Sequence, residues 1–369
     1  MRIGVPAETR PDERRVALVP DGVGKLTKAG CEVLVQRGAG IAAYLPDAAY
    51  EAVGATMVGS ASEALGADLV LKVQRPTLDE IGRLREGAAL VSFLAPAVSA
   101  DLLEALTRRK VSAFAMELVP RTTKAQSMDA LSSQATIAGY KAVLLGGESM
   151  GRIIPMLTTA AGTLAPAKIF VVGAGVAGLQ AIATARRLGG LVSAFDVRSV
   201  VREQVQSLGA SFVEVAAVEG EGQGGYAKEL ADEQQRRVVA AVGTHAEGQD
   251  LVITTAQIPG RAAPRLLTAA AVRAMKPGSV VVDLAAESGG NCELTRPGET
   301  VTEGGVTVLG PVNLAATVPL HASQMYGRNV LTFVTYLLKD GALNLDLADP
   351  ITGPMCVTHA GDLRTGKAG

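Results

Sequence analysis

The chain has 369 residues, a net charge of −1 and a hydrophobic content of 48%. This length allows two domains with substantial cores, and the mixed, nearly neutral charge excludes the basic surface of a nucleic-acid-binding protein. Ala and Val supply most of the hydrophobic content. No apolar run reaches the roughly 20 residues that cross a bilayer, so we expect no membrane span.

The N-terminal segment MRIGVPAETRPDERR is charged from its second residue and has no apolar signal core, so we expect a cytoplasmic chain. Cys31, Cys292 and Cys356 lie far apart and lack the spacing of metal ligands. We therefore expect inert thiols and no metal site.

Residues 1–120 alternate short apolar strands with helical patterns, which predicts a parallel α/β domain. The expected strands are Arg2–Val5, Glu32–Val35, Leu69–Lys72, Ala89–Phe93 and Ser112–Ala115. The expected helices are Gly22–Ala29, Ala48–Val53, Asp79–Leu84 and Ala100–Arg108. No phosphate-binding fingerprint follows the first strand.

The next stretch, residues 121–147, reads RTTKAQSMDALSSQATIAGYKAVLLGG and begins as a polar loop. From Met128 the apolar residues have helical spacing, which predicts a long helix that carries the chain into a second domain. Arg121, Gln126 and Asp129 have two interpretations at this point: an ordinary solvated loop with a helix N-cap, or a functional loop. Their spacing leaves both open.

A strand, a glycine-rich turn and a helix follow one another from residue 168 to residue 188. The apolar run Ile169–Val172 precedes a G-x-G-x-x-G pattern formed by Gly173, Gly175 and Gly178. Gly173 permits the turn, Gly175 lets the backbone approach a pyrophosphate, and Gly178 lets the helix pack against the sheet. The helix N-terminus offers N–H groups and partial positive charge to the phosphates. This unit predicts dinucleotide binding.

A second apolar run ends at Phe195, and Asp196 lies at its tip. In a unit of this kind the acid accepts hydrogen bonds from a ribose diol. Asp196 favours NAD over NADP because a 2′-phosphate would meet a carboxylate, although Arg198 is close enough to reduce that repulsion. We therefore predict NAD as the cofactor.

Four further strands are expected at Ser211–Val215, Asp250–Thr254, Ser279–Asp283 and Val306–Leu309. With the first two they give the six strands of a dinucleotide-binding domain. The acidic, glycine-rich segment 218–226 is either a flexible connection or a mobile lid that closes over the cofactor through Tyr226. Both interpretations remain open from the sequence.

Residues 310–369 return to helical patterns at Leu314–Val318 and Ser323–Asp340, and we expect them to fold back onto the first domain. The predicted fold is therefore α/β, with two Rossmann-like parallel-sheet domains. Residues 136–309 form the NAD-binding domain, which is inserted into the domain formed by residues 1–135 and 310–369.

Several stretches carry a family resemblance that covers essentially the whole chain. GVPAETRPDERRVALVP (residues 4–20) resembles the opening shared by alanine dehydrogenases and the NAD(H)-binding alpha component of proton-translocating transhydrogenase, and VVGAGVAGLQA (171–181) resembles their second signature. Three segments resemble the transhydrogenase branch: the loop after residue 120, GQGGYAKEL (222–230), whose Tyr226 matches a mobile-loop Tyr, and AAESGGN (285–291).

The resemblance implies roles for individual side chains. Gln126 contacts the nicotinamide ribose, Arg121 and Asp129 fix the loop and the amide, and Ser132 supports them. We take Gln126, Arg121 and Asp129 as the expected catalytic residues. The complete NAD(H) site expected from the fingerprint and the resemblance consists of Arg121, Thr122, Thr123, Lys124, Gln126, Asp129, Ser132, Gly173, Gly175, Val176, Gly178, Asp196, Val197, Arg198, Gly225, Tyr226 and Gln257.

The two branches differ in their need for a base. Alanine dehydrogenases supply a His after a strand of the first domain, where this chain has residues 94–96, Leu-Ala-Pro. Its histidines come later, and we expect surface or capping roles for His245 in a polar turn, His321 at a helix start and His359 in the tail. Hydride transfer between two nicotinamide rings needs close approach and exclusion of water, and it needs no acid or base. The missing His therefore favours transhydrogenase.

Only one dinucleotide fingerprint is present, so NADP(H) is expected on a separate polypeptide. The resemblance implies membrane-embedded and NADP(H)-binding partner subunits, a homodimer, and a place on the inner face of the membrane reached through those partners. Two alternatives remain. Arg15 and Lys72 resemble the substrate-holding pair of alanine dehydrogenases and suggest an amino-acid dehydrogenase, although we prefer to interpret them as structural charges. The lack of a catalytic base suggests a non-enzymatic NAD-binding module.

Overall fold

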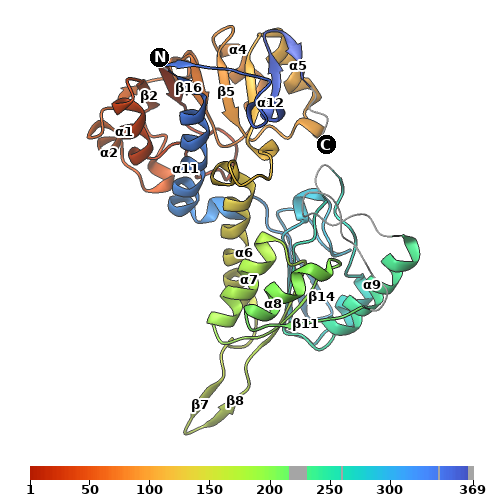
Figure 1. Cartoon of the computed structure of the whole chain (residues 1–369). Helices are drawn as coiled ribbons and strands as arrows, with labels where there is room; N and C mark the ends of the chain where they lie inside the picture. Colours follow the sequence, from red (N-terminus) through yellow and green to blue (C-terminus); the bar gives the residue numbers. More distant parts are fainter. Residues whose placement is uncertain (216–230, 259–260, 340, 365–369) are drawn as a thin grey trace. The chain divides into compact units, whose positions relative to one another are not determined.

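The computed structural model describes residues 1–215, 231–258, 261–339 and 341–364 (Figure 1). The chain forms two compact units: unit 1 is Met1–Gln134 with Ala315–Gly369, and unit 2 is Ala135–Leu314. It passes from one to the other within helix α6 (Ala130–Ser149). Each unit is built on its own, mainly parallel sheet, which confirms the predicted α/β class with two Rossmann-like domains.

Unit 1 contains an eight-stranded sheet in the order β19-β18-β6-β5-β4-β1-β2-β3. Its strands are β1 (Arg2–Val5), β2 (Glu32–Gln36), β3 (Thr56–Val58), β4 (Leu69–Leu71), β5 (Ala89–Ser92), β6 (Ser112–Ala115), β18 (Cys356–His359) and β19 (Asp362–Leu363). Strands β1 to β6 are parallel, and β18 pairs with β6 in the antiparallel direction. The C-terminal segment, predicted as helix, therefore also supplies strands. Strands β3 and β19 are very short, and β18 pairs with β6, which lies far away in the chain, so none of the three gives a clear local pattern.

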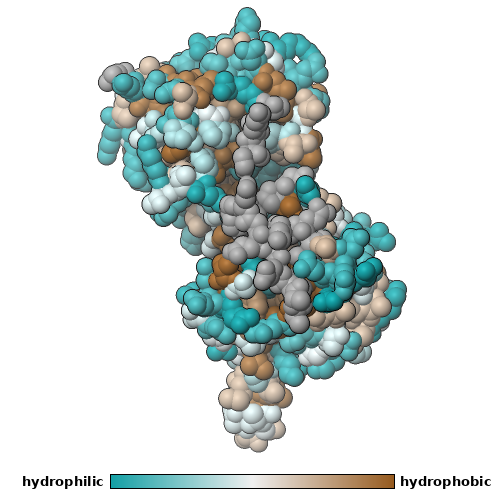
Figure 2. All heavy atoms as spheres, turned by 45° about the vertical axis from the view of Figure 1, so that its right-hand side comes forward, coloured by the Kyte–Doolittle hydropathy of each residue, from teal (hydrophilic) through white to brown (hydrophobic). Residues whose placement is uncertain are grey.

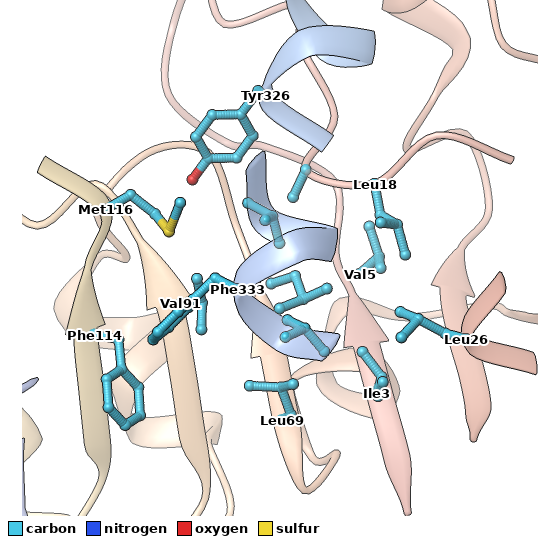
Figure 3. Packing of buried hydrophobic residues seen from close by; sticks show 14 of the residues in the cluster. Ile3, Val5, Leu18, Leu26, Leu69, Val91, Phe114, Met116, Tyr326 and Phe333 are labelled. Carbon is cyan, nitrogen blue, oxygen red and sulfur yellow. The ribbon is translucent and has the colours of Figure 1, made fainter. Parts of the chain in front are cut away.

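Helices cover both faces of this sheet. Neighbouring residues of a strand point to opposite faces, and the buried strands β4 and β5 are apolar on both. The helices are α1 (Pro20–Lys28), α2 (Asp47–Glu51), α3 (Ala61–Leu65), α4 (Leu78–Arg83), α5 (Ala100–Arg108), α11 (Pro319–Leu337) and α12 (Thr352–Met355). Ile3 and Leu69 lie on the face that α1 and α11 cover, and Figure 3 shows Tyr326 and Phe333 of α11 packed there. Val70 lies on the face that α3, α4 and α5 cover.

Unit 2 contains a seven-stranded sheet in the order β11-β10-β9-β12-β13-β15-β14. Its strands are β9 (Lys168–Val172), β10 (Leu191–Phe195), β11 (Ser211–Phe212), β12 (Leu251–Thr254), β13 (Val280–Asp283), β14 (Thr300–Glu303) and β15 (Val306–Leu309). The six predicted strands are present, with β11 shorter than expected, and β14 is an additional antiparallel edge strand. The first strand, β9, lies between β10 and β12, so the strand order reverses there. Parallel α/β sheets bind ligands at the carboxyl edge of such a point.

The helices of unit 2 after α6 are α7 (Val176–Arg187), α8 (Arg202–Ser207), α9 (Asp232–Ala246) and α10 (Ala269–Ala274). Buried side chains of α7 pack on one face of the sheet, where Ile182 contacts the cluster that contains Ile169 and Ile253. Those of α9 and α10 pack on the other face, where Val242 joins the cluster of Phe170. No helix of the residues described is both long enough and apolar enough to cross a membrane.

A short antiparallel hairpin, β7 (Leu157–Thr159) with β8 (Gly162–Leu164), lies between α6 and β9. This hairpin was not predicted from the sequence. All six strand residues are exposed, and Leu164 keeps 56% of its accessible surface. Figures 1 and 2 show the hairpin extending away from the sheet of unit 2, with pale and brown residues on its surface.

Candidate functional site

The three glycines of the turn after β9 have different structural roles. Gly173 has a φ of +101°, and a Cβ there would lie 2.6 Å from the Oγ1 of Thr255. A Cβ on Gly178 would lie 1.8 Å from the carbonyl oxygen of Gly173, so α7 can pack this closely only without a side chain. Gly175 has an ordinary φ of −75°, and a Cβ there would have no neighbour within 4 Å. Its surroundings are therefore open for a ligand.

The N-terminus of α7 lies beside this open space. Gly175 is the N-cap residue, and no side chain of the described residues caps the helix. Val176, the first helical residue, is 40% exposed. The first N–H groups of a helix have no intrahelical acceptor and carry a partial positive charge, which suits the phosphates of a dinucleotide.

Asp196 follows β10 and is directed at the glycine turn. Its Oδ2 accepts a hydrogen bond from the backbone N–H of Ala174 at 2.8 Å. Arg198, two residues further on, forms an ion pair with the same carboxylate at 2.7 Å. Val197, between them, is half-buried. Asp196 itself is 8% exposed, so the acid predicted to bind a ribose lies at the carboxyl edge of the sheet, next to the turn.

The loop after β12 contacts the glycine turn. Thr255 donates from its Oγ1 to the carbonyl of Gly173 at 3.0 Å. Asn291, which is fully buried, accepts from the N–H of Ala256 at 3.0 Å and donates to the Ala256 carbonyl at 2.8 Å. Gln257 is exposed and donates from Nε2 to the Leu284 carbonyl at 3.2 Å. Asn291 thus fixes the backbone from which Gln257 projects.

The turn that carries Asn291 is organised by a buried carboxylate, Asp283, at the end of β13. Asp283 has no exposed surface and accepts five hydrogen bonds. The donors are Thr254 Oγ1 (2.9 Å), Ala285 N (3.0 Å), Asn291 N (2.7 Å), Cys292 N (3.0 Å) and Thr295 Oγ1 (2.6 Å). A carboxylate can accept this many bonds because it has about four lone-pair sites and bonds can be shared. Neither Asp283 nor Asn291 was predicted as a site residue, although Asp283 ends a predicted strand and Asn291 ends the segment AAESGGN.

In unit 1, the polar loop after residue 120 leads into α6. Gln126 begins a short 3₁₀ turn, Gln126–Met128, and its side chain is exposed, as are the side chains of residues 121–124. Asp129 caps α6: its Oδ1 accepts from the N–H of Ser132 at 2.9 Å, and its Oδ2 accepts from the Ser132 hydroxyl at 2.6 Å. Asp129 and Ser132 therefore form one unit that fixes where the loop ends.

Helix α11 holds this loop from the other side. Asn329, 8% exposed, donates from Nδ2 to the Ser127 carbonyl at 2.8 Å. Lys124 donates from Nζ to the Tyr336 hydroxyl at 3.2 Å and lies 4.9 Å from the centre of that ring. The Tyr336 hydroxyl in turn donates to Asp349 at 2.6 Å. No local sequence pattern indicates these contacts with α11, because about 200 residues separate their partners.

Arg15 and Lys72 are both buried and both paired with carboxylates. Arg15 is 5% exposed, forms an ion pair with Glu13 at 2.7 Å and donates to Gln134 at 2.8 Å. Burial opposes ionisation of Glu13, but the hydrogen bonds and charge of Arg15 outweigh it and lower the pKa of Glu13 to about 2. Lys72 is 1% exposed and lies 2.8 Å from Glu80 and 3.3 Å from Glu8.

Two histidines differ from expectation. His245 is not in a turn: it lies on α9, its ring packs 4.5 Å from that of Phe170, and its Nε2 is 2.8 Å from Ser193 Oγ. His359 lies in β18, with Nδ1 2.9 Å from Ser112 Oγ. The strand that contains His359 was not predicted because its partner, β6, lies far away in the chain. His321 lies in the first turn of α11, as predicted.

The predicted site residues therefore fall into two groups. Those of residues 121–132 belong to unit 1, and those of the glycine turn and its surroundings belong to unit 2. Gly225 and Tyr226 lie outside the described residues. No group of three or more metal-ligating side chains is present in the part of the chain that the structure describes.

Comparison with known proteins gives two family matches that together span the chain. Residues 4–138 match the N-terminal domain of the Alanine dehydrogenase/PNT family, and residues 142–366 match its C-terminal domain. The chain belongs to the alanine dehydrogenase/PNT family. It is 44% identical to the NAD(P) transhydrogenase subunit alpha of Haemophilus influenzae, over 98% of this chain and 71% of that protein.

Two further relatives represent the two branches of the family. The solved structure of transhydrogenase from Sinorhizobium meliloti is 45% identical, has a TM-score of 0.91 and covers 98% of this chain and 100% of that one. The alanine dehydrogenase of Mycobacterium tuberculosis is 32% identical, over 98% of this chain and 94% of that protein. Both names occur among relatives that span the chain, so the site residues must distinguish the branches.

The segment after β5 is where a member of the alanine dehydrogenase branch is expected to supply a His. The resemblance to alanine dehydrogenases would place a His at residues 94–96, and this chain has Leu, Ala and Pro there. Ala95 has a φ of +48°, and its N–H and that of Leu94 both donate to Glu117. Burial raises the pKa of this Glu117 carboxyl. The segment is thus a structural turn without an imidazole.

Proposed function

We propose that this chain is the NAD(H)-binding component of a proton-translocating transhydrogenase. It would hold NADH while a hydride passes to NADP⁺ bound on a partner subunit, and membrane subunits would carry the protons. The observation that carries the proposal is the strand–turn–helix unit in which Gly173, Gly178 and Asp196 meet at the carboxyl edge of the unit 2 sheet. We assign NAD(H) binding to the domain predicted at residues 136–309.

Bound NADH supplies the hydride from its nicotinamide C4, and the protein has only to position it and exclude water. The first turn of α7 binds the pyrophosphate, and Asp196 binds the adenosine ribose. Gln126 contacts the nicotinamide ribose from its exposed position, and Arg121 and Asp129 orient the loop and the amide. The Asp129–Ser132 cap makes the end of that loop rigid. Gln257, anchored through Leu284, borders the same cofactor.

The geometry of unit 1 argues against an amino-acid substrate. A carboxylate substrate would need the positive charges of Arg15 and Lys72. Carboxylates of the chain already pair with both side chains. Displacing Glu13 or Glu80 by a substrate would leave a buried charge without compensation, which costs several kcal/mol. We therefore interpret the two cations as parts of the core of unit 1.

We further propose a homodimer that associates with the inner face of the membrane through its partner subunits. The β7–β8 hairpin supports the dimer, because an isolated two-stranded hairpin is marginally stable in water and gains most from packing against another surface. It also exposes Met156, Leu157 and Leu164. Deleting residues 157–164 should convert the dimer to monomer in sedimentation velocity, and an unchanged dimer would rule this contact out.

The test of function is hydride transfer from NADH to a chromogenic NADP⁺ analogue, with and without the NADP(H)-binding partner subunit. We expect turnover only when both proteins are present. Appreciable turnover by this chain alone would count against the proposal. Oxidation of NADH with pyruvate and ammonium would instead indicate an amino-acid dehydrogenase. Binding of NADH without turnover in any mixture would indicate a non-enzymatic module.

A further inference from the structure

Four hydrogen bonds within the protein already occupy the carboxylate of Asp196. Its Oδ1 accepts from the backbone N–H of Arg198 at 2.9 Å and from Arg198 Nε at 2.8 Å. Its Oδ2 accepts from the backbone N–H of Ala174 at 2.8 Å and from Arg198 Nη2 at 2.7 Å. A carboxylate offers about four lone-pair sites, and these four donors occupy them. Two more hydrogen bonds from a ribose diol would give six, more than the five that Asp283 accepts.

A ribose diol donates two hydrogen bonds to such an acid, so two of the four present donors must leave when the nucleotide binds. The two backbone N–H groups belong to the main chain beside the sheet, because Ala174 is part of the turn between β9 and α7 and Arg198 lies three residues after the end of β10. The guanidinium can leave, because it is carried on a long flexible side chain. Its two bonds to Asp196 form a parallel pair, the same geometry that a diol would use.

We propose that the guanidinium of Arg198 competes with the adenosine ribose for Asp196 and so sets both the affinity and the selectivity of the nucleotide site. This inference rests on the proposed NAD(H) function. In the free protein Arg198 neutralises the buried acid. In the bound protein it is displaced toward the 2′ position of the ribose, where a cation attracts a 2′-phosphate.

The burial of the pair makes this competition significant. The side chains of Arg198 and Asp196 are 14% and 5% exposed, so solvent screens their attraction weakly. Each NADH molecule that binds must break this charge-assisted pair, which reduces affinity for a nucleotide with a free diol. A nucleotide with a 2′-phosphate recovers part of that cost, because the displaced guanidinium gains a new anion. Arg198 therefore weakens discrimination between NAD(H) and NADP(H).

The test compares Arg198→Ala with wild type in equilibrium titrations of the full chain with NADH and NADPH. We expect NADH to bind about tenfold more tightly to the variant, which corresponds to about 1.4 kcal/mol. NADPH should gain less than NADH or bind more weakly. Arg152→Ala is the matched control, since Arg152 pairs with Asp250 at 2.5 Å at the opposite, amino edge of the same sheet. It should leave both affinities unchanged.

Weaker or unchanged NADH binding by Arg198→Ala would overturn the inference and would mean that Arg198 contacts the nucleotide favourably. Equal increases in affinity for NADH and NADPH would overturn the proposed effect on selectivity, since Arg198 would then hinder both nucleotides to the same extent. Failure of the wild-type chain to bind NADH would instead refute the proposed function. Circular dichroism and thermal unfolding of the variant establish that it is folded.

Discussion

Replacing Gly178 with alanine tests how the glycine turn builds the nucleotide site. The added Cβ would lie 1.8 Å from the carbonyl oxygen and 2.8 Å from the carbonyl carbon of Gly173. Both are backbone atoms of a turn that cannot rotate away. A tolerable contact needs about 3.2 Å, so α7 must move away from β9 by about 1.4 Å. Overpacking of this kind costs about 1–3 kcal/mol, and it displaces the helix N-terminus that binds the pyrophosphate.

We therefore expect Gly178→Ala to lower both the unfolding free energy and the affinity for NADH. Gly175→Ala is the control, because its Cβ would meet no atom within 4 Å and its φ of −75° suits alanine. This variant should unfold like wild type, within about 0.5 kcal/mol, yet bind NADH about tenfold or more weakly, because the Cβ occupies the approach to the phosphates. Denaturant unfolding and fluorescence titration measure the two quantities. Equal destabilisation by both variants, or full NADH binding by Gly178→Ala, would refute this division of roles.

Three further outcomes follow from buried contacts. Glu13 has a folded pKa of about 2 against 4.5, so its stabilisation is complete above pH 4.5 and is lost as the pH falls toward 2. The stability advantage of wild type over Glu13→Gln should shrink by about 2 kcal/mol between pH 6 and pH 3 in urea titrations, and a constant difference would contradict the pairing with Arg15. Asp283→Asn places an amide N–H₂ against hydrogen-bond donors and should lower the unfolding free energy by about 3 kcal/mol in the same assay. A loss below about 1 kcal/mol would argue against the role of Asp283 in organising the turn that carries Asn291. Asn329→Ala removes the hydrogen bond to the Ser127 carbonyl, so it should slow hydride transfer with the partner subunit about tenfold and lower the unfolding free energy by about 1 kcal/mol. An unchanged rate would show that α11 does not position the loop.

The regions of the fold that could be predicted from the sequence are those with strong local patterns. The unit from β9 to β10 combines β-branched runs, three glycines at fixed spacing and a terminal acid, and this combination is typical of one strand–turn–helix–strand structure. The structure gives a physical reason at Gly173 and Gly178, where a Cβ would collide with the backbone or with Thr255. The amphipathic helix α5 could also be predicted from the sequence, because a single apolar stripe along it specifies a helix.

The regions that could not be predicted depend on partners far away in the chain. Strand β18 is recognisable only once β6 is beside it, and the hairpin β7–β8 has no buried face to produce a pattern. His245 was predicted to lie in a polar turn because Phe170, whose ring packs against it, lies 75 residues earlier in the chain. The contact from Asn329 to Ser127 and the saturation of Asp196 are likewise properties of assembled geometry. Residue identity alone does not reveal which lone pairs are already occupied.

The fate of the hydrogen that leaves NADH shows whether the hydride passes directly between two bound nicotinamide rings. NADH deuterated at C4 on the transferred face would be mixed with this chain, the NADP(H)-binding partner subunit and NADP⁺, and the products would be identified by mass spectrometry. Direct transfer between two bound nicotinamides predicts that all of the transferred deuterium appears in NADPH and none in water. Deuterium in the solvent, or in a product other than NADPH, would show that the hydride does not pass directly between the two nicotinamide rings.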